Sequence, residues 1–224
     1  EVADMFYKTL IIRSANASAV LMTALALLLF QTQALADERA KILVLGDSLS
    51  AGFGMDLSAS WTTLLQLKLD DLGYGYKVVN ASISGDTTSS GLRRLPRALR
   101  VHQPEIVIIE LGGNDGLRAT PIPVVRDNLV QLIETSQAAG ATVVVAGIQM
   151  PPNYGVGYTD EFTALFFDAA AETDSALIPF FMKNIALNPA MMQMDNIHPN
   201  AQAQPLLLDN TWDVLGPLLE QPAN

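Results

Sequence analysis

Residues 41–53, with the sequence KILVLGDSLSAGF, decide the fold of this chain. Ile42 to Leu45 form a short, unbroken apolar run that ends at Gly46, a pattern typical of a parallel strand buried on both faces. Ser48 follows this run, so we expect it on a tight turn at the carboxyl end of the strand, just before a helix. There its hydroxyl points out of the sheet, and nearby backbone N–H groups face a ligand. Taken alone, Gly-Asp-Ser is also a common turn sequence, so the rest of the chain decides its role.

The amino-terminal segment has the pattern of a secretory signal peptide. Lys8 and Arg13 precede an apolar stretch at residues 19–30, and small residues end the segment at Ala36. This stretch is well short of the ~20 residues that a membrane anchor needs. We therefore expect cleavage after Ala36, removal of residues 1–36, and a periplasmic or secreted bacterial protein.

Residues 37–224 are long enough for one domain with a sizeable core, and they contain no internal repeat or interdomain linker. The formal net charge is −10 with scattered basic residues, which argues against nucleic acid and anionic membrane surfaces as partners. The chain has no cysteine, which excludes a disulfide framework, a cysteine nucleophile and a lipid anchor on cysteine. His102 and His198 are the only histidines, so the composition favours neither a structural zinc site nor any other metal.

Five apolar runs with the character of buried strands alternate with segments of helical periodicity. The expected strands are residues 42–45, 77–81, 105–111, 142–148 and 176–180. The expected helices have their apolar faces within residues 61–72, 92–99, 125–133, 162–169 and 200–219. Pro96 is expected in the first turn of its helix or at a kink. The alternation predicts a three-layer α/β/α sandwich with a five-stranded parallel sheet in the flavodoxin-like order 2-1-3-4-5.

This strand order brings two polar loops together. The winding direction reverses between strands 1 and 3, and ligands bind at the carboxyl ends of the strands at such a point. Ser48 follows strand 1 and Asn114 follows strand 3. We therefore expect the two side chains to face each other across one crevice.

A histidine base for Ser48 is available near the end of the chain. Asp195 stands three residues before His198 at a helix entrance, where its carboxylate can turn back to the imidazole and fix its tautomer. His102, at the end of a helix and the opposite end of strand 3, suits packing or capping instead. A lone Asp-x-x-His is also a common capping pattern, so the spacing alone does not establish the pair.

Two further positions have both a structural and a chemical interpretation. Gly85 follows strand 2, where it serves a turn with positive φ or directs its N–H at a developing oxyanion. Asn114 serves as a turn or helix cap, or as an amide donor to the same oxyanion. Asp47 and Asp115 stand beside the site, and we expect them to hold the loops by accepting backbone N–H groups rather than to act as extra acids.

Taken together, these blocks resemble the SGNH (GDSL) hydrolase family. They are GDSLS with Ser48, SGDT with Gly85, GGND with Asn114, and DNIHP with Asp195 and His198, in this order. Longer stretches such as VVNASISGDTTSSGLRRLP and IELGGNDGLR are similar to its bacterial thioesterase I/lysophospholipase L1 (arylesterase) branch, and the resemblance covers nearly all of residues 41–220. It implies an α/β/α fold and hydrolysis of acyl esters or thioesters without a cofactor.

The resemblance also implies a role for each residue in these blocks. Ser48 is the nucleophile, His198 the base and Asp195 the acid that orients it. The N–H groups of Ser48 and Gly85 and the amide of Asn114 form the oxyanion hole. The implied reaction passes through an acyl-enzyme on Ser48, which water activated by His198 then hydrolyses.

The segment after strand 4 suggests how an acyl chain is bound. Met150, Pro151 and Tyr154 are expected to form an apolar wall, which Met192 extends from the segment before Asp195. Four more residues are candidates to extend this wall, namely Phe181, Met182, Met191 and Met194. The sequence thus predicts a monomer, without a membrane anchor after cleavage, that hydrolyses small-molecule esters or thioesters with medium-to-long acyl chains.

The sequence also has three other interpretations. A flavodoxin-like binding module lacks both G-x-G-x-x-G and G-x-x-x-x-G-K-[ST], and it leaves the Asp195 and His198 pair unused. An α/β-hydrolase has G-x-S-x-G in the middle of the chain, whereas Gly46-x-Ser48-x-Ser50 opens this domain. The third is an SGNH acetylesterase that acts on acetylated carbohydrate. This alternative stays open, because only the acyl-chain preference of the enzyme distinguishes it.

Overall fold

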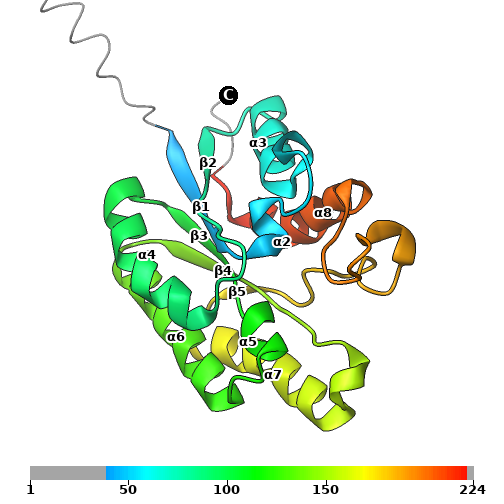
Figure 1. The fold of residues 1–224 in the computed structure, drawn as a ribbon. Coiled ribbons are helices and arrows are strands. Elements are labelled where there is room, and N and C mark those ends of the chain that lie inside the picture. The colour runs from blue at the N-terminus through cyan, green and yellow to red at the C-terminus, as the bar shows by residue number, and fades with distance from the viewer. Residues whose placement is uncertain (1–38, 221–224) are drawn as a thin grey trace, which may run out of the picture. The chain divides into compact units, whose positions relative to one another are not determined.

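The computed structural model describes residues 39–220, so the expected signal peptide lies outside the described residues. Strands and helices alternate along this part of the chain (Figure 1). The strands are β1 Ala40–Gly46, β2 Tyr76–Asn80, β3 Ile106–Glu110, β4 Thr142–Ala146 and β5 Ala176–Ile178. The α-helices are α2 Ser48–Ala51, α3 Trp61–Asp71, α4 Thr88–His102, α5 Gly113–Leu117, α6 Ile122–Ala138, α7 Val156–Glu172 and α8 Gln204–Leu215.

The five strands form one parallel sheet in the order β2-β1-β3-β4-β5, which confirms the prediction. In the register of the two central strands, Gly46 at the end of β1 lies beside Glu110 at the end of β3. Strands β1 and β3 therefore end at the same edge of the sheet, and the segments with Ser48 and Asn114 start side by side.

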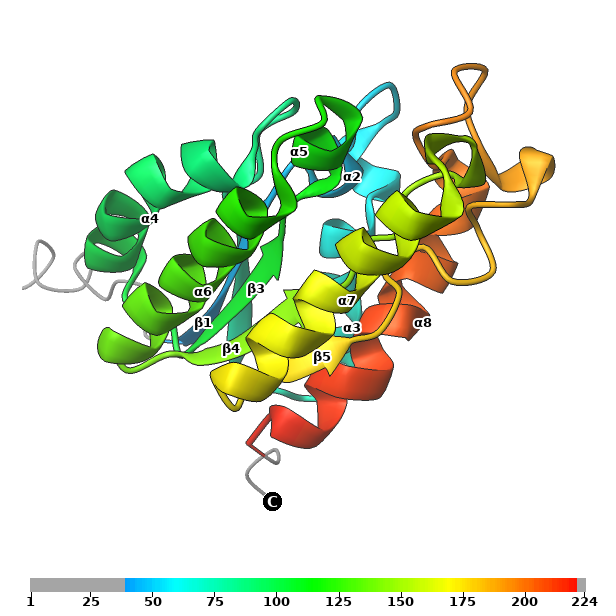
Figure 2. The same ribbon diagram turned by 90° about the horizontal axis from the view of Figure 1, so that it is seen from below.

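Helices cover both faces of the sheet. Helices α4, α6 and α7 form one layer, and α3 and α8 form the other (Figure 2). Residues 42–45 and all of β3 are buried, because these central strands have a helical layer on each side. None of the helices in the described residues is long and apolar enough to cross a membrane.

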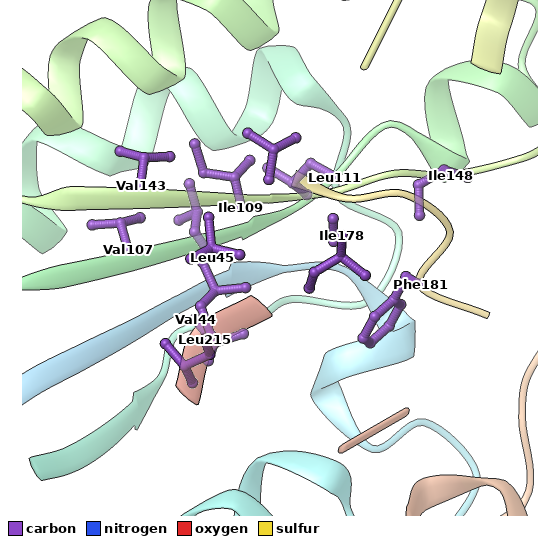
Figure 3. Packing of buried hydrophobic residues seen from close by; sticks show 14 of the residues in the cluster. Val44, Leu45, Val107, Ile109, Leu111, Val143, Ile148, Ile178, Phe181 and Leu215 are labelled. Carbon is purple, nitrogen blue, oxygen red and sulfur yellow. The ribbon is translucent and has the colours of Figure 1, made fainter. Parts of the chain in front are cut away.

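Branched aliphatic side chains from neighbouring strands fill the space between the layers (Figure 3). The largest fully buried side chains are Trp61, Phe162, Phe166 and Phe181. Phe181 packs edge-on against Trp61, with ring centroids 5.5 Å apart. Phe181 therefore belongs to the core and does not extend an acyl-binding wall.

Most strands begin or end within two residues of the predicted bounds, and the larger differences from the sequence prediction concern three helices. Helix α4 begins at Thr88, where Thr87 caps it by accepting from the Ser90 N–H, so Pro96 lies in the helix interior rather than its first turn. The glycine-rich run after β3 forms the short helix α5, which lacks the apolar periodicity that marks a helix in sequence. Helix α7 begins at Val156, ahead of the apolar face expected at residues 162–169.

Candidate active site

Ser48 is the first residue of α2, directly beyond the end of β1. Asp47 caps this helix, its Oδ1 accepting from the Leu49 N–H at 3.0 Å. Gly46 makes the tight exit from the strand possible: a Cβ there would lie 2.8 Å from Glu110 Oε2 and 2.9 Å from Ser50 Cβ. The turn presents the half-buried Ser48 hydroxyl at the carboxyl edge of the sheet, as predicted.

His198 and Asp195 complete a hydrogen-bonded chain with Ser48. His198 Nε2 lies 2.9 Å from Ser48 Oγ, and His198 Nδ1 lies 2.6 Å from Asp195 Oδ2. The other Asp195 oxygen accepts from the backbone N–H groups of Ile197 and His198, each at 3.0 Å. These bonds, with the imidazole bond, lower the pKa of Asp195 from 3.8 to about 2. An ionised Asp195 keeps the imidazole proton on Nδ1, which leaves Nε2 free to accept the Ser48 proton.

Hydrogen bonds from Gln193 hold the His198 segment against the turn after α2. Gln193 Nε2 donates to the carbonyls of Phe53 at 2.8 Å and Pro199 at 3.0 Å, and Gln193 N donates to the His198 carbonyl at 2.8 Å. The Phe53 ring lies over the His198 imidazole, with ring centroids 4.4 Å apart. Phe53 and Gln193 thereby fix the position of the imidazole relative to Ser48.

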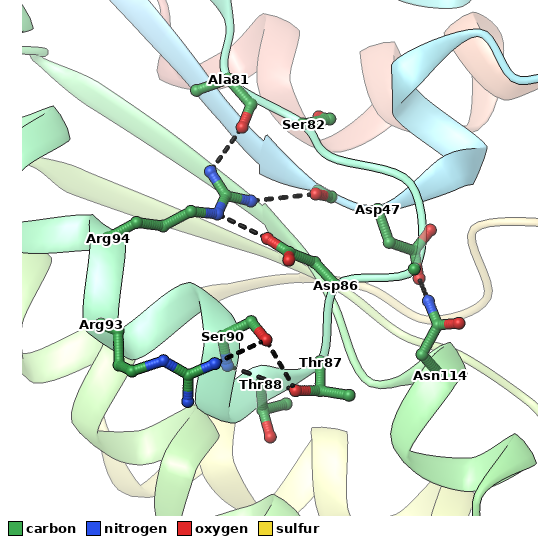
Figure 4. A network of polar contacts seen from close by, with 12 residues as sticks. Asp47, Ala81, Ser82, Asp86, Thr87, Thr88, Ser90, Arg93, Arg94 and Asn114 are labelled. Carbon is green, nitrogen blue, oxygen red and sulfur yellow. Dashed lines mark hydrogen bonds and ion pairs between the residues drawn. The ribbon is translucent and has the colours of Figure 1, made fainter.

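Asn114 lies in α5, beside the Ser48 turn. Its Nδ2 donates to Asp47 Oδ2 at 2.8 Å (Figure 4). Because a primary amide has two N–H groups, this bond orients Asn114 and leaves a second donor. The structure thus brings Asn114 next to the serine turn, as the strand order predicted. Its role as an oxyanion donor stays a prediction.

Two buried carboxyl groups lie beneath this turn. Burial raises the pKa of Asp47 to about 6, although bonds from Leu49 and Asn114 work against the rise. Burial and the neighbouring Asp47 charge raise the pKa of Glu110 well above its usual value. Glu110 Oε2 accepts from Ser50 Oγ at 2.7 Å and from the Asp47 N–H at 3.3 Å, which supports the serine turn from below.

Asp115 also holds a loop, as the sequence predicted for it and for Asp47. It is buried, and its two oxygens accept from the Thr88 N–H at 2.8 Å and the Thr88 hydroxyl at 2.9 Å. These bonds join α5 to the start of α4. His102, by contrast, is the last residue of α4, at the end away from the site.

Gly85 lies in the exposed loop between β2 and α4, with a φ of 85°. The loop is tied to the serine strand, because the Ile83 N–H donates to the Gly46 carbonyl at 3.0 Å. The Gly85 carbonyl accepts from Arg118 Nη2 at 3.1 Å. Gly85 is not among the residues that line the cavity around Ser48. The role of its N–H as an oxyanion donor stays a prediction.

A cavity of about 350 Å³ opens beside the hydroxyl of Ser48. Ser48, Asn114 and His198 line its polar part. Its walls are mostly apolar and include Leu49, Leu117, Ile148, Met182, Leu187 and Ile197. The predicted wall residues Met150, Pro151 and Met192 also line it.

Tyr154 does not line this cavity, which corrects the prediction. The chain enters a 3₁₀ turn at Pro152–Tyr154, and the Tyr154 ring stacks on Tyr158 with centroids 6.2 Å apart. Met191 and Met194 also lie outside the lining, and Met194 is fully exposed.

The described residues hold no group of three or more His, Asp or Glu side chains arranged to bind a metal ion.

Residues 44–205 match the model of the GDSL-like Lipase/Acylhydrolase family. The chain belongs to this family. It is therefore a hydrolase of the GDSL, or SGNH, type, and the sequence resemblance is confirmed.

Similar proteins cover almost the whole GDSL domain. Esterase TesA of Pseudomonas aeruginosa is 48% identical over 200 residues, which are 89% of this chain and 98% of the relative. Thioesterase 1/protease 1/lysophospholipase L1 of Escherichia coli is 46% identical over 178 residues, 80% of this chain and 84% of the relative. The crystal structure of esterase EstA from Pseudoalteromonas sp., inhibited by monoethylphosphonate, has a TM-score of 0.76 and 43% identity, covering 80% of this chain and 97% of that one.

Sequence reasoning missed several parts of this GDSL-type site. Glu110 carries a visible signal, because a carboxyl group within a wholly apolar central strand must be buried and needs a partner. Phe53 and Gln193 carry no such signal, since their contacts join segments far apart in the chain.

Proposed function

We propose that this GDSL-type hydrolase cleaves carboxylic esters and thioesters of medium-to-long acyl chains through an acyl-enzyme on Ser48. The observation that carries the proposal is the hydrogen-bonded chain from Asp195 through His198 to Ser48, which ends at a mostly apolar cavity. A nucleophile, a base oriented by a carboxylate, and room for an acyl group are the parts that acyl transfer requires.

The reaction proceeds in two steps. In the first, His198 Nε2 takes the Ser48 proton as Oγ attacks the acyl carbonyl, and the Ser48 N–H, the Gly85 N–H and the Asn114 amide stabilise the oxyanion. His198 then returns the proton to the leaving alcohol or thiol. In the second, water loses a proton to His198 as it attacks the acyl carbonyl, the bond from Ser48 Oγ to the acyl group breaks, and His198 returns the proton to Oγ as the acid leaves. Asp195 stays ionised throughout and stabilises the imidazolium.

The relatives support this chemistry by their names, which are esterase for one and thioesterase and lysophospholipase for the other. Inhibition of EstA by monoethylphosphonate also supports it, because a phosphonate on a nucleophile resembles the tetrahedral intermediate. We propose an alcohol or a thiol as the leaving group.

Recognition of the substrate rests on its acyl part. Asp47 and His198 are the only ionisable residues among those that line the cavity, and both belong to the site itself. Flexible thioethers at Met150, Met182 and Met192 suit acyl chains of different lengths. We therefore expect a strong dependence on chain length and a loose choice of leaving group.

A p-nitrophenyl ester series from acetyl to palmitoyl tests the proposal. We expect kcat/KM to rise by up to about fourfold per methylene, or ~0.8 kcal/mol, until the cavity is filled. Met192→Ala removes part of the wall and should lower kcat/KM for octanoyl but not for acetyl esters. Met194→Ala is the matched control, because Met194 is exposed outside the cavity. A series that is fastest for acetyl and then falls steadily supports the alternative, an acetylesterase acting on acetylated carbohydrate.

We propose, in addition, that residues 1–36 direct export and that the mature protein is a periplasmic or secreted monomer. The basic start, the apolar stretch and the small residues before Asp37 support export. Mass spectrometry of protein from the periplasm or medium should give Asp37 as the first residue, and size-exclusion chromatography should give the monomer mass. Retention of residues 1–36, or a dimer, contradicts the respective part.

A further inference from the structure

Arg94, in the middle of α4, reaches across to the chain segments that carry Ser48 and Gly85 (Figure 4). Its Nε donates to Asp86 Oδ2 at 2.5 Å, and its Nη2 donates to the Gly46 carbonyl at 3.1 Å. Its Nη1 donates to the Ala81 carbonyl. One guanidinium thus holds three acceptors, one at the end of β1 and two in the loop between β2 and α4.

Each acceptor stands close to a part of the active site. Gly46 is two residues before Ser48, and its carbonyl also accepts from the Ile83 N–H of the neighbouring loop. Ala81 follows the end of β2, and Asp86 directly follows Gly85. Arg94 therefore fixes the distance between the turn of the nucleophile and the loop of a predicted oxyanion donor.

The pair of Arg94 and Asp86 lies largely inside the protein, where solvent screens it little. The exposed fraction is 21% for the Arg94 side chain and 13% for that of Asp86. Arg94 also donates to two backbone carbonyls, so its guanidinium is held in one orientation. An ion pair at the surface lacks this restraint.

The same helix also holds the third predicted donor. Thr88, the first residue of α4, donates twice to Asp115, the residue next to Asn114. Helix α4 thus contacts all three segments that carry predicted oxyanion donors. Arg94 joins it to the Ser48 and Gly85 segments, and Thr88 joins it to the Asn114 segment.

We propose that Arg94 is a positioning residue for the hydrolytic reaction, holding the Ser48 turn and the Gly85 loop so that the oxyanion donors converge before the substrate arrives. The inference rests on the proposed function. Its physical basis is that preorganised donors stabilise the transition state, and that a displacement of about 1 Å can cost about a hundredfold in rate.

Arginine is specific for this task. Its planar fork presents donors in fixed directions to several acceptors, whereas lysine has one ammonium group on a flexible stem. Arg94→Lys keeps the positive charge but cannot hold all three acceptors in the same geometry. A role in charge alone predicts that lysine suffices, and a positioning role predicts that it does not.

The first experiment compares variants at two neighbouring arginines. We expect Arg94→Ala to lower kcat by about a hundredfold with KM nearly unchanged, and Arg94→Lys to lower kcat by at least about tenfold. Arg93→Ala is the matched control. Arg93 is exposed on the same helix and donates only to Ser89 and Ser90, so its loss should leave kcat unchanged.

The second experiment asks whether Arg94 acts through the oxyanion hole. Asn114→Ala alone should lower kcat by about 10²–10³-fold. In the Asn114→Ala background, Arg94→Lys should cost less than it does in the parent protein, because the donors it aligns are already incomplete. An acyl trifluoromethyl ketone forms an oxyanion on Ser48, so Arg94→Lys should weaken its inhibition by the same factor as kcat.

These outcomes separate the inference from the proposed function. Labelling of Ser48 by a fluorophosphonate, abolished in Ser48→Ala, tests the nucleophile whatever Arg94 does. The positioning role is overturned if Arg94→Lys keeps the parent kcat, if its defect lies in KM, or if its effect adds fully to that of Asn114→Ala. If Arg94→Ala does not fold, Arg94→Lys and Asp86→Asn decide, and a lowered melting temperature with unchanged kcat for both also overturns the role.

Discussion

Replacing Ser48 with alanine is expected to abolish hydrolysis while the fold is retained. The expected loss in kcat is on the order of 10⁶, because the acyl-enzyme cannot form without the hydroxyl. Ser48 Oγ lies 2.9 Å from His198 Nε2 at the mouth of the cavity, and alanine leaves the cap of α2 by Asp47 in place. The measurements are kcat on a p-nitrophenyl ester, fluorophosphonate labelling, and the melting temperature of the variant.

Two nearby serines provide the controls. Ser84 is exposed in the loop before Gly85, so Ser84→Ala should keep both labelling and activity. Ser50 is buried and donates to Glu110, where a phosphonate has no access. A label found on Ser50 or Ser84 in the parent protein would refute the assignment of Ser48.

Asp195→Asn should give the second largest loss, on the order of 10⁴ in kcat. An asparagine can present its NH₂ group to Nδ1 and favour the tautomer with the proton on Nε2, which cannot accept the Ser48 proton. The pKa of Asp195 is lowered to about 2, so the parent carboxylate is ionised at every pH above about 4. The ratio of parent to variant activity should therefore stay large across that whole range.

The control for this variant is Asp209→Asn, which makes the same change at an exposed aspartate of α8. Its kcat should equal that of the parent. If Asp195→Asn retains activity within about tenfold of the parent, Asp195 only caps the turn before His198, as its two bonds to backbone N–H groups alone would suggest.

The sequence by itself determined the sheet and the position of the site on it. The apolar runs of β1 and β3 are local patterns, and both strands are buried because helices pack on each side of them. Asp195 and His198 stand three residues apart, so their approach is also a local property of the turn. The strand order then placed Ser48 and Asn114 together, because adjacent parallel strands end at one edge.

Only the tertiary structure decided which side chains from distant segments meet. Tyr154 turns onto Tyr158 rather than into the cavity, since the 3₁₀ turn at Pro152–Tyr154 sets its direction. The Phe53 ring packs on His198, and Arg94 donates hydrogen bonds to three acceptors outside its own helix. Periodicity predicts the face on which a residue lies, but not its partner, because partners are chosen by how separate elements pack and by which buried polar groups still need a hydrogen bond.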